Sequence, residues 1–166
     1  MATAENLNAA FAGESQANRK YTAFAKKADQ EGFKQVAKLF RAAAEAETVH
    51  AHAHLRVMNG IKTTAENLAV ARDGEAYEFQ TMYPEFLVAA KTENNKGAIK
   101  TFEFAMAAEK AHFDLYSKAL EAVKAGTDLT NAVIYLCPFC GDVEIGVLPD
   151  KCPICGAPKD KFVEVK

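Results

Sequence analysis

Residues 47–54 read ETVHAHAH and place one glutamate and three histidines in an alanine-rich segment with helical periodicity. Each residue of an α-helix advances by about 100°, so side chains three positions apart lie about 60° apart and share a face. Glu47 and His50 therefore point the same way. His52 lies about 140° from Glu47 and is expected to face solvent or a subunit contact. His54 returns to within about 20° of Glu47, but two turns further along the helix.

The Glu-x-x-His unit occurs a second time, at Glu109 and His112. Other helical stripes also carry glutamate at mid-helix, Glu14 in the first and both Glu75 and Glu78 in the third. A dinuclear iron or manganese carboxylate bundle takes one Glu from each of two helices and Glu-x-x-His from each of the other two. This chain has that set plus one extra carboxylate.

These glutamates have a competing interpretation as solvated surface residues beside incidental histidines. A single Glu-x-x-His is weak evidence, because charged helices often produce it by chance. Two copies on otherwise apolar stripes, at matching depth and with partners on the other helices, favour the metal site. Carboxylates clustered in an apolar core are very costly unless cations offset their charge, and two divalent ions would do so.

The periodicity predicts four helices within residues 1–125, which we interpret as an all-α, ferritin-like four-helix bundle. Gly32 closes the first helix and Asn59-Gly60 the second. A capping box of Thr63 with Glu66 is expected to open the third helix. This helix contains a candidate break at Asp73-Gly74 and an expected kink at Pro84. The segment NNKG marks the turn before the last helix. Residues 126–132 are interpreted as a linker.

All four cysteines lie in residues 133–166, a region rich in Pro, Gly and β-forming residues that we expect to form a small metal-held domain. The segments CPFCG and CPICG contribute Cys137, Cys140, Cys152 and Cys155. Four thiolates in paired knuckles suit either Zn²⁺ or a single iron, and the spacing alone does not separate a zinc ribbon from a redox iron centre. A neighbouring dinuclear redox site favours iron, because it needs an electron supply.

The composition argues against several other classes of protein. The net charge of −2, without a basic cluster, gives no electrostatic footprint for nucleic acid. No apolar run approaches the roughly 20 residues that span a bilayer. The first residues, MATAENLNAAFAGES, lack a basic region followed by an apolar stretch, so we expect no secretory signal, a cytoplasmic location and no disulfides.

The carboxylate bundle followed by two C-P-x-C-G units resembles the rubrerythrin family over essentially the whole chain. The resemblance includes FAGES (11–15), GEAYEFQTMYPEF (74–86), AEKAHFDLY (108–116) and CPICGAPKDKF (152–162). It implies a ferritin-like di-iron bundle with a C-terminal rubredoxin-like domain. The implied activity is reduction of hydrogen peroxide to water, in oxidative-stress protection. Electrons would come from NAD(P)H through a reductase or a separate rubredoxin and enter at the Fe(Cys)4 centre formed by the four cysteines.

The resemblance also implies a role for each bundle ligand. Glu47 and Glu109 would bridge the two irons, Glu14 and Glu78 would bind one of them, and Glu75 and His112 the other. His50 would replace Glu78 when the site is reduced, so these two residues are the expected catalytic pair. We predict Tyr21, Tyr83 and His54 as hydrogen-bonding neighbours of the ligands, although core tyrosines with satisfied hydroxyls fit the pattern equally well.

The identity of the metals and the function keep alternatives at this point. Glu and His ligands accept zinc or manganese as well as iron. A ferroxidase or iron-binding protein with a structural zinc ribbon is the alternative function, and a scaffold with degenerate sites is a weaker one.

The connector between the second and third helices, counted as Gly60–Gly74, is short. It reaches only about 32 Å, whereas the second helix that it would have to cross is about 40 Å long. We therefore predict a domain-swapped homodimer, an arrangement that some short members of the family adopt.

Overall fold

The computed structural model describes residues 2–130 and 132–166, so Met1 and Asn131, the latter in the expected linker, lie outside the described residues. The chain divides into two compact units, Met1–Lys62 and Thr63–Lys166. The first is a pair of helices, and the second combines further helices with a small three-stranded sheet. Among the described residues, no helix has both the length and the apolar character that a membrane crossing requires.

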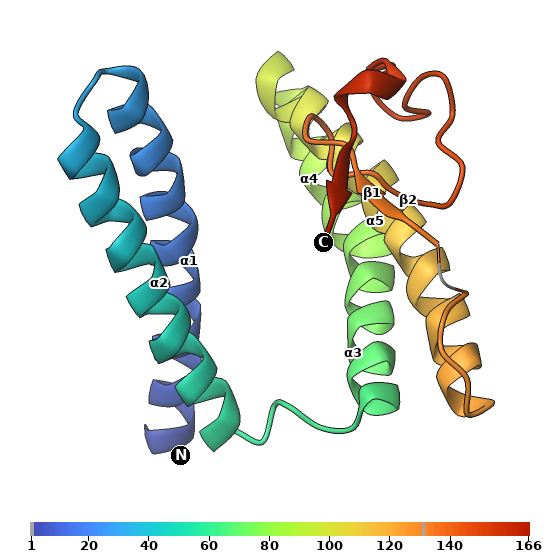
Figure 1. Ribbon diagram of the computed structural model, residues 1–166, viewed down its shortest axis with the longest axis horizontal. Helices are drawn as coiled ribbons and strands as arrows, with labels where there is room; N and C mark the ends of the chain where they lie inside the picture. Colours follow the sequence, from blue (N-terminus) through green and yellow to red (C-terminus); the bar gives the residue numbers. More distant parts are fainter. Residues whose placement is uncertain (1, 131) are drawn as a thin grey trace. The chain divides into compact units, whose positions relative to one another are not determined.

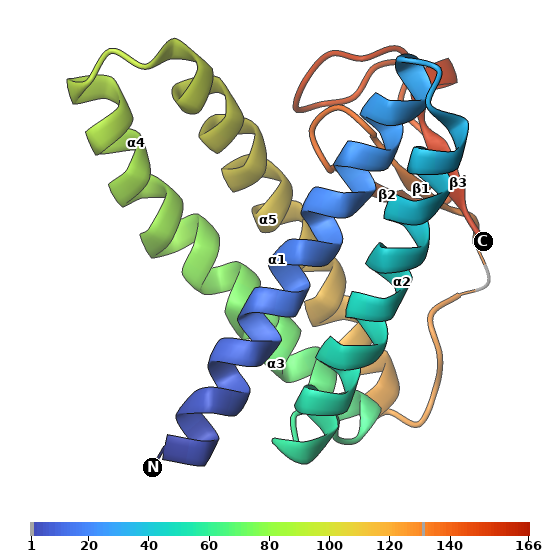
Figure 2. The same cartoon turned by 90° about the vertical axis from the view of Figure 1, so that its left-hand side faces the viewer.

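The first unit is a helical hairpin of α1 (Ala2–Gln30) and α2 (Lys34–Val57), which run side by side in Figures 1 and 2. Gly32 ends the first helix as predicted, with a φ of +87° that favours glycine. The seam between the helices is built of small residues that let the backbones approach closely. These buried residues are Ala25, Ala28, Ala37, Ala44 and Ala51.

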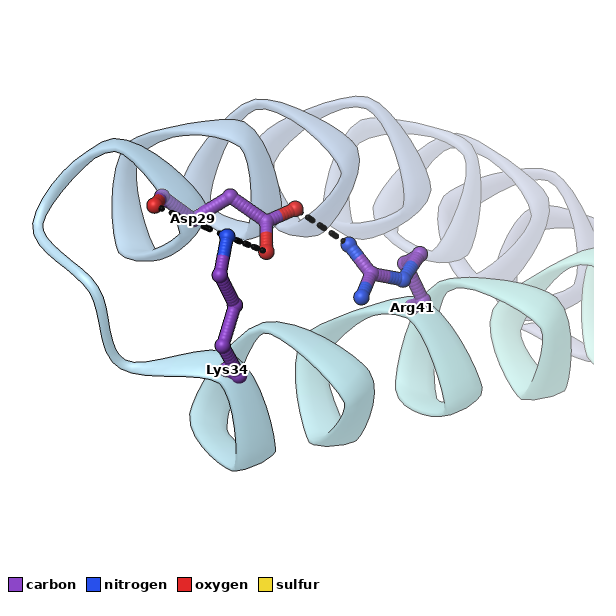
Figure 3. Close-up of polar contacts among 3 residues, drawn as sticks. All are labelled: Asp29, Lys34 and Arg41. Carbon is purple, nitrogen blue, oxygen red and sulfur yellow. Dashed lines mark hydrogen bonds and ion pairs between the residues drawn. The ribbon is translucent and has the colours of Figure 1, made fainter.

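The turn of this hairpin is tied by Asp29 (Figure 3). Its Oδ2 accepts a hydrogen bond from Arg41 Nη1 at 2.7 Å, and its Oδ1 lies 3.4 Å from Lys34 Nζ. The bond from Arg41, joined by the contact with Lys34, lowers the pKa of Asp29. The three side chains are partly exposed, so the ion pairs add little stability, but they join the end of α1 to the first turns of α2.

The second unit contains one long helical stretch that pairs with α5 (Lys96–Lys124). It consists of α3 (Thr64–Tyr77), the π-helical turn η1 (Glu78–Met82) and α4 (Tyr83–Thr92). The predicted capping box of Thr63 and Glu66 opens it. The candidate break at Asp73-Gly74 was wrong, because α3 passes through Gly74. The irregularity lies instead at η1, just before Pro84 in the first turn of α4.

The C-terminal part of the second unit is a small antiparallel sheet with strand order β2-β1-β3. Its strands are β1 (Ile134–Leu136), β2 (Val143–Ile145) and β3 (Val163–Val165), with a short 3-10 turn at Lys159–Lys161. Tyr135 pairs with Glu144 on one side and with Glu164 on the other. The expected architecture of four helices followed by a small four-cysteine domain is confirmed. The domain boundaries at 125/126 and 132/133 stay predictions.

Candidate metal centres

The first unit brings together the carboxylates of Glu14 from α1 and Glu47 from α2 with the imidazole of His50. One ligand atom from each lies within 4.8 Å of the others. His50 Nδ1 is 3.1 Å from Glu47 Oε2, as the i, i+3 spacing predicts. A hydrogen bond to Glu47 raises the pKa of Glu14, while hydrogen bonds from Glu14 and His50 lower the pKa of Glu47. Two carboxyls that share one proton form a site at which a cation could replace that proton.

The second unit brings together Glu75 from α3 with Glu109 and His112 from α5, again within 4.8 Å. Burial, followed by the hydrogen bond and negative charge of Glu109, raises the pKa of Glu75 to about 7. Glu78 stands outside this closest group, at the start of the π-helical turn. Burial and then the charge of Glu109 raise the pKa of Glu78 as well. Its carboxylate therefore faces the same cluster. Single π-helical turns often occur at functional sites.

His112 is held in an orientation that suits a metal ligand. Its Nε2 lies 2.9 Å from the carbonyl oxygen of Gly141, which can only accept, so Nε2 carries the hydrogen and donates it. Nδ1 then faces the carboxylates, 2.8 Å from Glu109 Oε2 and 3.7 Å from Glu75 Oε2. A neutral imidazole of this tautomer has its free lone pair on Nδ1. Such a second hydrogen bond is how proteins orient histidine ligands.

The predicted neighbours of the ligands differ in where the structure places them. Tyr83 is partly buried, and its pKa is raised by burial and then by the charges of Glu109, Glu78 and Glu75, so its hydroxyl lies near those carboxylates. His54 lies close enough for its charge to influence Glu14. Tyr21 packs in an aromatic cluster with Phe24 and Phe40, at ring-centroid distances of 6.4 and 6.3 Å. The exposed position expected for His52 agrees with its exposure in the structure.

Asn18 is a buried polar residue whose role the sequence did not reveal, although it follows Glu14 by one turn on the same stripe. It is 8% exposed. Its Nδ2 donates to the Ala44 carbonyl at 2.7 Å and to Thr48 Oγ1 at 2.8 Å, and its Oδ1 accepts from Arg19 Nε at 2.8 Å. Its two partners on α2 lie on either side of Glu47 in the sequence. Asn18 thus fixes the register of the two helices beside the Glu14–Glu47 pair.

Replacing Asn18 with alanine should therefore destabilise the protein by about 1–2 kcal/mol, because Thr48 and Arg19 lose a partner in a partly buried setting. Asn8→Ala is the matched control. Asn8 lies on the same helix, is exposed and donates only to Ala4 of its own helix, and both substitutions gain the same helix propensity. Denaturant unfolding measures the difference, and equal midpoints for the two variants would show that the cross-helix bonds contribute nothing.

The four cysteines form one compact cluster. Cys137 Sγ lies 3.6 Å from Cys155 Sγ, and Cys140 Sγ lies 3.5 Å from Cys152 Sγ. Metal–sulfur bonds of about 2.3 Å in a tetrahedron give sulfur–sulfur edges of about 3.8 Å, close to these separations. Burial raises the pKa of Cys152 to about 11, so a cation is needed to hold this thiol as a thiolate.

The two cysteine knuckles repeat the same backbone pattern. Gly141 N donates to the Cys137 carbonyl and Gly156 N to the Cys152 carbonyl, at 3.0 and 2.9 Å. Both glycines have positive φ, +86° and +74°. Each knuckle thereby turns its two thiols inward. The donor sets of both the knuckles and the helical cluster fit metals, in agreement with the sequence analysis.

The raised carboxyl pKa of Glu75 gives the metal-free protein a pH-dependent stability. The pKa is near 7 in the folded protein against 4.5 for the ordinary carboxyl, so the folded state binds this proton more tightly. The stabilisation is complete below the unfolded pKa and is lost as the pH rises through 7. We expect the unfolding temperature of metal-free protein to fall by about 2–5 °C between about pH 5 and pH 8. Thermal melts of Glu75→Gln at several pH values should show an unfolding temperature that depends less on pH. An unchanged dependence would refute its assignment to Glu75.

Comparison with known proteins gives two family matches. Residues 5–120 match the rubrerythrin family, and residues 135–163 match the rubrerythrin, rubredoxin-like domain. Nigerythrin of Nitratidesulfovibrio vulgaris is 38% identical, with 96% of this chain and 85% of that protein covered. Rubrerythrin-2 of Clostridium acetobutylicum is 33% identical, covering 96% of this chain and 95% of that protein.

Solved structures give the same result. A mixed-valence structure of nigerythrin is 38% identical and covers 98% of this chain and 86% of that one, with a TM-score of 0.59. A fully reduced, all-ferrous structure of nigerythrin is 37% identical with the same TM-score and coverage. Nigerythrin is thus an iron protein. Because both family matches and relatives above 30% identity extend over nearly its whole length, the chain belongs to the rubrerythrin family, with candidate di-iron carboxylate groups and a rubredoxin-like four-cysteine site.

Proposed function

We propose that this protein is a non-haem di-iron peroxidase that reduces hydrogen peroxide to water, with electrons delivered through the Fe(Cys)4 centre. The observation that carries the proposal is the double contact of His112. One of its nitrogens faces the carboxylate cluster, and the other bonds the carbonyl of Gly141, the residue that follows Cys140. A single imidazole thereby joins the two candidate metal centres, which supports an electron supply from one to the other.

The chain's own residues would share the work as follows. Glu47 and Glu109 would be the carboxylates shared by a bound iron pair, and Glu14, Glu78, Glu75 and His112 would complete its ligand set. The pair, when bound and reduced, supplies the two electrons that cleavage of a peroxide O–O bond consumes. His50, which lies beside Glu47, would take the place of Glu78 as a ligand in the reduced protein, because a neutral nitrogen suits the lower charge. Tyr83, whose pKa is raised by burial and then by the charges of Glu109, Glu78 and Glu75, would offer its hydroxyl as a hydrogen-bond donor to these carboxylates.

The test is metal analysis after anaerobic purification, together with peroxide consumption driven by NADH, a rubredoxin reductase and a rubredoxin. We expect a red protein with iron in both sites and NADH oxidation in proportion to peroxide. A cytoplasmic location, where NADH is available, fits this proposed activity. A colourless protein with zinc in the cysteine site, which oxidises ferrous iron without consuming NADH, would instead identify a ferroxidase with a structural zinc ribbon.

We also propose that the di-iron site is completed by two chains in a domain-swapped homodimer. Each unit holds its own half of the ligand set. Because the third helix already begins at Thr64, the connector comprises only residues 58–63 and is shorter than the expected connector Gly60–Gly74. It reaches about 25 Å at most, whereas α2 is about 36 Å long. A ferritin-like arrangement needs a crossover along the whole bundle, so the second half of each site would come from the partner chain.

Mixing two inactive variants tests this arrangement directly. One chain carries Glu14→Ala and Glu47→Ala, and the other carries Glu109→Ala and His112→Ala. In a swapped heterodimer one site combines both intact halves, so co-expression should restore about a quarter of the wild-type peroxidase activity per chain. Without swapping every site keeps one damaged half. Co-expressed chains that form heterodimers yet stay inactive would rule the swap out.

A further inference from the structure

A cavity of about 550 Å³ lies within the second unit, between α5 and the two cysteine knuckles. Lys100 and Phe104 of α5 line one side, while Phe139 of the first knuckle and Cys155 of the second line the other. Lys161, in the 3-10 turn that follows the second knuckle, completes the rim. The cavity therefore opens beside Cys155, one residue of the four-cysteine site.

The four thiols differ in what surrounds them. Cys137 and Cys152 are buried, at 0% and 2% exposure, whereas Cys140 and Cys155 are intermediate. Cys140 is followed by Gly141, whose carbonyl accepts a hydrogen bond from His112 on the side of the carboxylate cluster. Cys155 opens into the cavity. The centre thus has one side turned toward the helices and another that is accessible from outside, as an electron relay requires.

The surface around Cys155 combines an apolar centre with cationic groups. Phe139 is 62% exposed, although it is a large aromatic side chain beside a metal site. The Lys100 ammonium lies 5.4 Å from the centroid of the Phe104 ring. Lys161 is half exposed and forms an ion pair with Asp160 at 3.2 Å, which offsets part of its charge. Among the described residues that line the cavity, none is acidic.

We propose that this cavity and its lysine rim form the docking face for the protein electron donor, a small carrier that presents acidic side chains around its own redox group. The inference rests on the proposed function and names the partner's chemistry. Transient redox complexes bury little surface, so an apolar contact at the redox centre brings the two groups close, while opposite charges around it steer the encounter. Phe139 would supply the apolar contact, and Lys100 and Lys161 the steering charges.

The experiment is a double charge reversal, Lys100→Glu with Lys161→Glu, in the full iron-loaded protein. Stopped-flow mixing with a reduced rubredoxin that carries an acidic face follows reduction of the Fe(Cys)4 centre. We expect the second-order rate to fall about tenfold at low ionic strength, and the difference from wild type to shrink at high salt. Lys118→Glu with Lys124→Glu is the matched control, because these exposed lysines of α5 do not line the cavity and the net charge changes equally.

The visible spectrum of the centre should be the same in all three proteins, since neither substitution touches a ligand. The reduction potential of each protein is measured as well, so that a rate change caused by a shifted potential is separated from a loss of docking. Equal rates in the two double variants, or a loss that persists unchanged at high salt, would overturn the proposal. So would a wild-type centre that the reduced rubredoxin does not reduce. A failure of the proposed function looks different: the centre would be reduced with the expected dependence on the lysines, yet peroxide would not be consumed.

Discussion

Glutamine in place of Glu109 is expected to reduce iron binding in the helical site to less than half and peroxide turnover by on the order of a hundredfold or more. Glu109 contacts more of the cluster than any other proposed ligand. Its Oε2 lies 2.8 Å from His112 Nδ1, and after burial it is the main cause that raises the pKa of Glu75, Glu78 and Tyr83. An amide has nearly the same shape but lacks the negative charge and one acceptor oxygen, so it should bind cations more weakly.

The matched control is Glu103→Gln. Glu103 lies on the same helix but is half exposed, with only a 3.9 Å contact to Lys91. Metal analysis and steady-state peroxide consumption should leave this variant at wild-type values. The iron of the cysteine site, read from its visible absorption, should survive in both variants. A Glu109→Gln protein with its full iron pair and normal turnover would remove Glu109 from the ligand set.

Alanine in place of Cys152 is expected to abolish the red Fe(Cys)4 centre and, with it, peroxide reduction driven by NADH. Cys152 is 2% exposed and its Sγ lies 3.5 Å from Cys140 Sγ. Three thiols leave the tetrahedral site open, and the three-residue strands β1, β2 and β3 are too short to hold the small domain without metal. The helical site should keep most of its iron, because its ligands lie on other elements and only the bond from His112 to the Gly141 carbonyl is lost with the small domain.

Two measurements separate these effects. After chemical reduction of the iron pair, the Cys152→Ala protein should still consume peroxide in a single turnover, whereas continuous turnover from NADH should be undetectable. Lys151→Ala, at the neighbouring exposed position, should retain the colour and the full NADH-linked rate. Continuous NADH-linked turnover in the Cys152→Ala protein would mean that electrons reach the helical site without the cysteine centre.

Most of the candidate site could be predicted because its signals are short in sequence. The pairs Glu47/His50 and Glu109/His112 each lie within one turn of one helix, so a spacing of three decides that the two side chains meet. The two cysteine knuckles are equally local, since each C-x-x-C unit builds its own turn. The capping box at Thr63 and the closure of the first helix at Gly32 also depend only on neighbouring residues.

The sequence by itself indicated the candidate metal-binding residues and that they lie on helices and cysteine knuckles, because these are properties of local spacing. The tertiary structure alone showed that α3 passes through Gly74 into a π-helical turn, where packing overrides the weak propensity of glycine. It alone revealed the bonds of Asn18 across the helix pair. It also joined His112 to Gly141, 29 residues later in the chain. Such contacts depend on how two elements pack against each other, and no short sequence pattern records that.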